Sequence, residues 1–265
     1  MRTRTATEQL PPLVLNRAGR FAHLVESVGD PDLDVAATPG WTVQDLVTHV
    51  ATGSGRYTDA LDGAARVAAD RPALAELNVA ENRRFGRLPI GDLPPAIRHG
   101  AATLVEKVAA SGTDQTVPFH GRAAVTAEQL LGIYLGELLV HGRDLAGALG
   151  RRWTIEPDEA AAAIAAVSPG LTGWLSPRAR HHTATYALSL RGHGRQLWVF
   201  DDGDLSVDPP GRHRVDVTIS ADPATLLLVA YGRTSQWPAI ATGRMIAWGR
   251  RPWLAFSLTS RLQRP

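Results

Sequence analysis

The chain of 265 residues contains no cysteine. This absence excludes disulfide bonds, thiolate metal ligands and a cysteine nucleophile, so any thiol used in catalysis would have to come from another molecule. Lysine is almost absent as well: Lys107 is the single example, and arginine supplies the other basic side chains. No run of 18 apolar residues occurs, and we therefore expect no membrane span.

The charge balance is nearly even, with a formal net charge of +2. So small an excess does not argue for nucleic acid as a partner. Arginine binds planar anions better than lysine does, which leaves a carboxylate-bearing ligand open. The first 20 residues are basic but lack a long apolar run, which argues against a secretory signal. We expect a cytoplasmic protein with no membrane partner, either a monomer or a small homo-oligomer.

Length and composition allow one large or two modest packed domains, since 44% of the residues are hydrophobic and 20% are charged. The first half has apolar positions at helical spacing and turn signals between the segments. The helices expected there cover residues 10–28, 43–61, 74–87, 95–110 and 127–149. Helices joined by modest loops predict an up-and-down four-helix bundle over residues 1–150.

Two of these helices have clear start signals. Thr42 with Asp45, and Thr126 with Gln129, have the spacing of capping boxes. Gly150 follows the last of the helices and is a typical stop signal.

The composition changes after residue 150. Alternating apolar residues and turn signals predict a smaller α+β domain over residues 151–265. Its expected elements are helices at 157–167 and 224–231, strands at 183–191, 197–200 and 214–220, a turn at 201–204 and a final amphipathic stretch at 239–262.

Three side chains suggest a metal site. Glu137 and His141 are four residues apart, so both lie on one face of a helix. His49, on another helix of the bundle, would supply a third ligand. Two histidines and one carboxylate leave coordination positions open, which is typical of catalytic rather than structural sites. Asp144, three residues after His141, would either orient its ring or remain a solvated residue of the last turn.

The same residues also have a plain structural reading. With nine histidines in the chain, a Glu-x-x-x-His spacing arises easily by chance. Glu137 and His141 would then be a helical ion pair, and His49 a hydrogen-bonded core histidine. Against this reading, Glu137 lies among leucines and valines, where a carboxylate needs a partner of opposite charge.

Two motifs resemble those of the mycothiol-dependent maleylpyruvate isomerase family. The first reads Pro39-Gly40-Trp41-Thr42-Val43-x-Asp45-Leu46-x-x-His49. The second reads Glu137-x-x-x-His141-Gly142-x-Asp144-Leu145-Ala146-x-Ala148-x-Gly150. In the second half, the similarity to sterol carrier proteins lies in residues 197–200, 215–219 and 226–233. The resemblance covers nearly the whole chain.

This resemblance implies a DinB-like bundle that holds a divalent metal, usually zinc, with His49, Glu137 and His141 at the positions of the metal ligands. It also implies the thiol cofactor mycothiol and an arginine pocket for the thiol and an acidic substrate. Arg233 is the best positional match for that pocket, and Arg83 or Arg84 is a looser candidate; a surface role is open for each.

The implied chemistry is addition of the metal-activated thiol to an electron-poor double bond of a small electrophilic or dicarboxylate substrate. Rotation and loss of the thiol give cis-trans isomerisation; retention of the thiol gives an S-transferase. Two further readings stay open: a non-catalytic protein that binds an apolar ligand, and a metal hydrolase. The tail adds Trp237, Trp248 and Trp253, which we expect to pack within the second domain.

Overall fold

The computed structural model describes residues 6–263. The chain divides into two compact units, unit 1 up to Ile155 and unit 2 from Glu156 onward. We describe each unit by itself. In the described part of the chain, no helix is long and apolar enough to cross a membrane.

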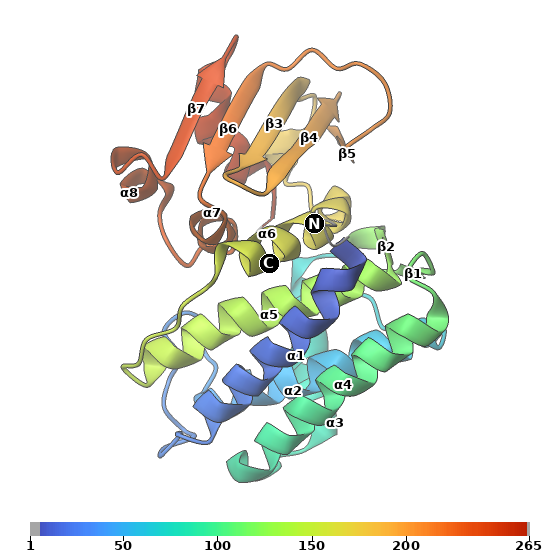
Figure 1. Ribbon diagram of the computed structural model, residues 1–265, viewed down its shortest axis with the longest axis vertical. Helices are drawn as coiled ribbons and strands as arrows, with labels where there is room; N and C mark the ends of the chain where they lie inside the picture. The colour runs from blue at the N-terminus through green and yellow to red at the C-terminus, as the bar shows by residue number, and fades with distance from the viewer. Residues whose placement is uncertain (1–5, 264–265) are drawn as a thin grey trace. The chain divides into compact units, whose positions relative to one another are not determined.

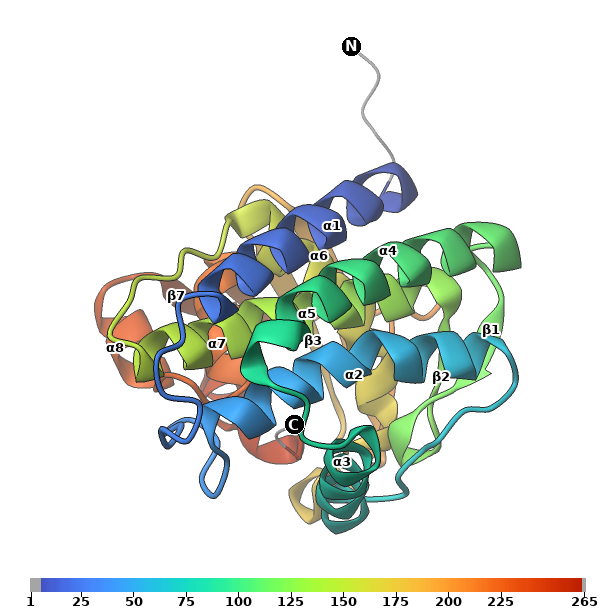
Figure 2. The same ribbon diagram turned by 90° about the horizontal axis from the view of Figure 1, so that it is seen from below.

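Unit 1 is a four-helix bundle, as predicted (Figure 1). Its helices are α1 (Ala6–Val25), α2 (Val43–Leu61), α4 (Leu93–Ser111) and α5 (Ala127–Ala148). Figure 2 shows that α1 and α5 run in one direction and α2 and α4 in the other. The chain reaches α4 from α2 by way of a further helix, α3 (Arg71–Phe85).

The sequence signals explain these helices. α2 turns its apolar residues inward, and Leu46 and Val47 are fully buried. α5 is apolar on almost all sides and buried along most of its length, as expected for a central helix. Both predicted capping boxes are present: Thr42 caps α2 and Thr126 caps α5.

α3 differs from the other helices of unit 1 because its one buried residue is a glutamate, Glu81. It begins after Asp70, whose side chain accepts a hydrogen bond from the amide of Ala73. Arg66 forms an ion pair with Glu81 at 2.7 Å, and Asn82 donates to the carbonyl of Asp45 at 3.1 Å. Polar contacts thus hold α3 against α2.

Part of unit 1 was not predicted. Between the expected helices 95–110 and 127–149, where no element was predicted, the antiparallel strand β1 (Thr116–Pro118) pairs with β2 (Ala124–Thr126). Strands of three residues are too short to show a period in the sequence. Two short 3₁₀ helices, η1 (Ile90–Asp92) and η2 (His120–Arg122), complete the unit.

Unit 2 is built on a five-stranded sheet with the order β5-β4-β3-β6-β7 (Figure 1). Only β3 and β6 pair in parallel; the other neighbours in this sheet are antiparallel. The strands are β3 (Ala184–Leu190), β4 (Gly194–Asp201), β5 (Asp204–Val207), β6 (Val217–Ala221) and β7 (Met245–Gly249). Alternate residues such as Tyr186, Phe200 and Ile219 face the apolar core.

The helices of this unit are short. They are α6 (Pro157–Val167), α7 (Pro223–Ala230) and α8 (Gln236–Ala241), with the 3₁₀ helices η3 (Ser168–Gly173), η4 (Pro177–Ala179) and η5 (Pro252–Arg261). Helices beside a mostly antiparallel sheet make this an α+β domain, as predicted.

One expectation for unit 2 is confirmed and another is wrong. The turn predicted at 201–204 is present: Asp201 pairs with Asp204, and Asp202 and Gly203, both with positive φ, connect β4 to β5. The stretch 239–262 is not one amphipathic element: it covers the end of α8, then β7 and then η5. The partner strand β6 decides this, because it supplies the hydrogen bonds for β7.

The tryptophans of the tail do not pack inside the domain, which corrects the expectation above. Trp237, Trp248 and Trp253 are 59%, 49% and 60% exposed. Trp237 stacks on Phe256, which is itself half exposed, with 5.8 Å between the ring centroids.

Candidate metal centre

α5 supplies one side of the centre. Glu137 and His141 are one turn apart on this helix, and Nε2 of His141 lies 3.1 Å from Oε2 of Glu137. Both side chains are largely buried. The residues of α5 around Glu137 are mostly apolar. The carboxylate therefore has the partner of opposite charge that its surroundings demand.

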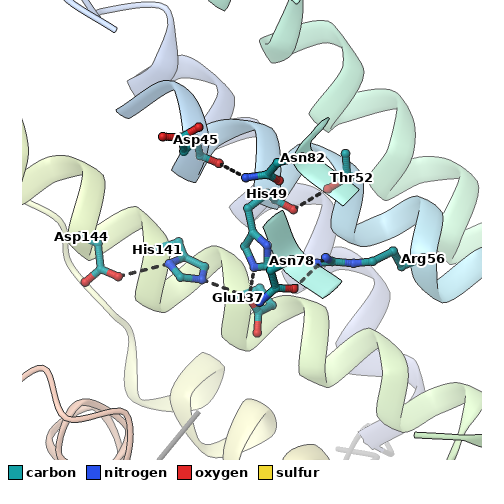
Figure 3. Close-up of polar contacts among 9 residues, drawn as sticks. All are labelled: Asp45, His49, Thr52, Arg56, Asn78, Asn82, Glu137, His141 and Asp144. Carbon is teal, nitrogen blue, oxygen red and sulfur yellow. Dashed lines mark hydrogen bonds and ion pairs between the residues drawn. The ribbon is translucent and has the colours of Figure 1, made fainter. Parts of the chain in front are cut away.

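α2 supplies the other side. Nε2 of His49 lies 3.3 Å from the same carboxylate oxygen of Glu137, across 88 positions of sequence. His49, Glu137 and His141 each offer a ligand atom, and these atoms all lie within 4.8 Å of one another. Figure 3 shows the three side chains pointing toward one another from the two helices.

The Pro39-Gly40 pair of the first motif places an aromatic ring beside the centre. The amide of Trp41 donates to the carbonyl of Thr38, and Gly40 has a φ of 85°, as in a type II turn with proline and glycine at its central positions. The ring of Trp41 lies 5.0 Å from that of His49 and 6.5 Å from that of His141. The turn thus explains why this motif precedes α2.

The glycine of the second motif fixes how α5 packs. A Cβ atom on Gly142 would lie 2.2 Å from the ring of Trp153, so only glycine fits there without a shift. The indole nitrogen of Trp153 donates to the carbonyl of Leu139 at 3.0 Å, and the guanidinium of Arg17 covers the ring at 5.0 Å. These contacts hold the turn of α5 that carries His141.

The two histidines are supported differently. Nδ1 of His141 lies 3.2 Å from the buried carboxylate of Asp144, the arrangement that commonly orients a histidine ligand. Nδ1 of His49 is buried and has no hydrogen-bond partner among the described residues. His49 is held by packing and by its contact with Glu137.

The surroundings shift the pKa values of His49, Glu137 and His141. Burial lowers the pKa of His49 to about 4, and the charge of Arg56 adds to this effect. Burial opposes ionisation of Glu137, but hydrogen bonds from His141 and His49 outweigh it and hold the pKa of this carboxyl well below its usual value. Burial also opposes charge on His141, yet hydrogen bonds to Asp144 and Glu137 raise its pKa to about 9.

This donor set fits a divalent cation. Two imidazoles and a carboxylate suit zinc and other borderline metals, and three protein ligands leave positions for further ligands. His49 is neutral near pH 7 and can donate at once, whereas a cation bound at Nε2 of His141 would displace its proton.

The structure brings together His49, Glu137, His141 and Asp144. Arg84 is an exposed residue of α3 and lines a cavity between α2, α3 and α4. Arg233 belongs to unit 2, where its Nη1 donates to the carbonyl of Tyr231 at 2.9 Å.

The sequence reading missed two polar residues near the centre. Arg56 lies seven positions after His49 on α2, a spacing that returns to the same helix face, so the signal was present. Nη1 of Arg56 donates to Oδ1 of Asn78 on α3 at 3.2 Å, as Figure 3 shows. For Asn78 the sequence carried no such signal, since α3 has little apolar pattern.

Comparison with known families agrees with both units. The model of the mycothiol maleylpyruvate isomerase N-terminal domain matches residues 15–146, and that of the SCP-2 sterol transfer family matches residues 167–249. The chain belongs to the mycothiol-dependent maleylpyruvate isomerase family. No curated protein matches it by sequence.

Solved structures share the fold. A crystal structure of the mycothiol-dependent maleylpyruvate isomerase is similar, with a TM-score of 0.57 and 17% identity, over 92% of this chain and 95% of that one. A histidine-to-alanine variant of that enzyme gives a TM-score of 0.57 and 16% identity over the same shares. At this identity the likeness establishes the two-domain architecture.

Proposed function

We propose that the chain is an enzyme that uses a divalent cation, zinc by preference, and the thiol mycothiol to isomerise an electron-poor double bond of a small acidic substrate. The convergence of three ligand atoms within 4.8 Å carries the proposal, because two imidazoles and a carboxylate at this spacing match the donor set of a divalent cation. Membership of the isomerase family supports the choice of thiol and reaction.

His49, Glu137 and His141 would hold the cation, and Asp144 would orient His141 through Nδ1. When bound, the cation would favour the thiolate form of mycothiol, which is the form needed for addition to an electron-poor double bond. Trp41 would shield the two imidazoles from water on one side. Arg84 and Arg233 would bind acidic groups of the thiol or substrate.

Metal analysis tests the site directly. Protein purified without added ions is expected to carry about one divalent ion per chain. His49→Ala and Glu137→Ala should lose it, while His23→Ala, which changes an exposed histidine of α1, should keep it. Retention of the ion by both site variants would refute the ligand assignment.

Product analysis tests the reaction. With mycothiol and maleylpyruvate, the trans isomer should accumulate, and omission of the thiol should abolish turnover. If the thiol instead stays in the product, with this substrate or with an aromatic halide electrophile, the protein is an S-transferase. Equal turnover without thiol, or hydrolysis of an ester panel, would contradict thiol dependence.

A further inference from the structure

Arg56 carries a positive charge that the fold leaves without an anionic partner. Its side chain is half buried, and its hydrogen bond in the described structure goes to the neutral amide of Asn78. No carboxylate of the described residues lies within ion-pair distance of it. A half-buried charge is stabilised by a counter-ion, so this position favours an anion from outside the chain.

Arg66 lines the same cavity between α2, α3 and α4 as Arg56 does, but its charge has carboxylate partners. It forms ion pairs with Asp59 at 2.9 Å and with Glu81 at 2.7 Å, so its charge is already compensated. The two arginines line one cavity, but the fold neutralises the charge of Arg66 and not that of Arg56.

The guanidinium of Arg56 points back toward the metal centre. Its Nη2 lies 3.6 Å from where a Cβ atom of Gly53 would be, one turn of α2 away from His49. Figure 3 shows the side chain directed from α2 toward the level of Glu137.

Arg56 also lines a cavity of about 490 Å³ between α2, α3 and α4. Arg84 and the hydroxyl residues Thr52 and Ser54 line the same space. Counting its charged lining residues, three arginines stand against Asp59 and Glu81, which leaves one positive charge in excess. The volume suits a small molecule, and the charge of Arg56 gives the lining a site for a carboxylate.

We propose that Arg56 is a specificity-determining residue that binds a carboxylate of the substrate beside the metal centre, with Asn78 holding its guanidinium in place. The inference rests on the proposed function and adds a residue to it. The planar fork of arginine matches a carboxylate through two parallel hydrogen bonds, which lysine cannot reproduce.

Maleate binding tests this assignment. Calorimetric titration of the metal-loaded protein with maleate, at constant ionic strength, is expected to show saturable binding. Arg56→Met should weaken it about 10- to 100-fold, the range for a lost charged hydrogen bond, and Arg56→Lys should restore part of the loss. Arg98→Met should bind as the unchanged protein does, because Arg98 pairs with Glu26 on the surface.

The outcomes separate this inference from the proposed function. Unaltered maleate affinity in Arg56→Met with full metal content, no binding by the unchanged protein, or tighter binding of inorganic phosphate would overturn the role of Arg56. If the unchanged protein carried no divalent ion after purification, this result would instead count against the metal site. In turnover assays, Arg56→Met should raise KM for a dicarboxylate by the same factor, whereas Arg98→Met should leave this KM unaltered.

Discussion

The two units bury ionisable side chains in opposite ways. In unit 2, His182 and the hydroxyl of Tyr186 are 2.9 Å apart, and Asp216 accepts hydrogen bonds from the amide of Thr185 and from Arg250. Each of these side chains has a hydrogen-bond partner within unit 2. In unit 1, Glu137 shares one oxygen between two histidines, and one ring nitrogen of His49 has no partner among the described residues. Polar groups that pair with one another stabilise the fold, whereas three donor atoms that converge on one point are the arrangement expected of a ligand site.

The largest expected effect comes from disrupting the packing of α5 against Trp153 in unit 1. Gly142→Ala forces a Cβ atom into the ring of Trp153, so we expect a loss of about 3 kcal/mol in the free energy of unfolding. Urea unfolding would measure it. Hydrogen exchange should increase in α5 and leave the sheet of unit 2 as it was.

Gly147→Ala is the matched control on the same helix. Nothing lies within 4 Å of a Cβ atom there, so the variant should equal or exceed the original stability by up to about 1 kcal/mol. A similar loss in both variants would show that the contact with Trp153 is not the cause.

A second change sharpens the comparison at the centre itself. Asp144→Asn removes the carboxylate behind His141 but keeps the size of the side chain. We expect metal affinity to fall about 10- to 100-fold, measured by competition with a chelator. Asp92→Asn, at an exposed position of unit 1, should have no effect; unaltered affinity in Asp144→Asn would remove Asp144 from the site.

The smallest effect concerns pH and unit 2. Burial, followed by the charges of Arg261 and Arg251, lowers the pKa of His182 to about 4, below about 6.5 for the unfolded chain. The neutral form therefore stabilises the fold fully above about pH 6.5, and this contribution disappears as the pH falls toward 4. With solvent screening it amounts to about 1 kcal/mol.

Unfolding of His182→Gln beside the unchanged protein at pH 7.5 and pH 4.5 isolates this contribution. The unchanged protein should lose more stability on acidification than the variant does. His213→Gln, on a partly exposed loop of the same unit, should lose as much stability on acidification as the unchanged protein does. Equal slopes in all three would mean that His182 does not titrate with folding.

Sequence reasoning succeeded where signals were local. Apolar spacing and two capping boxes gave the helices of the bundle, since these depend on residues within one helix. It failed for β7, because an edge strand forms only when β6 offers hydrogen bonds. The turn between β4 and β5 was predicted, since Asp202-Gly203 is a strong local turn signal, but the four-residue strand β5 that follows it was not.

For the centre, the four-residue spacing of Glu137 and His141 was readable, but their approach to His49 depends on how α2 packs against α5. Arg56 was open to detection from its spacing to His49. Its lack of a carboxylate partner was not, because this depends on Asp59 and Glu81 being taken by Arg66.

The composition of α3 has a consequence for denaturation. This helix buries only Glu81, so its release from α2 would expose little apolar surface to water. Such an opening would have a small m-value and a small heat-capacity change, unlike unfolding of the bundle. Low urea would therefore barely promote it, whereas high salt, which screens the ion pair of Arg66 with Glu81, would promote it more.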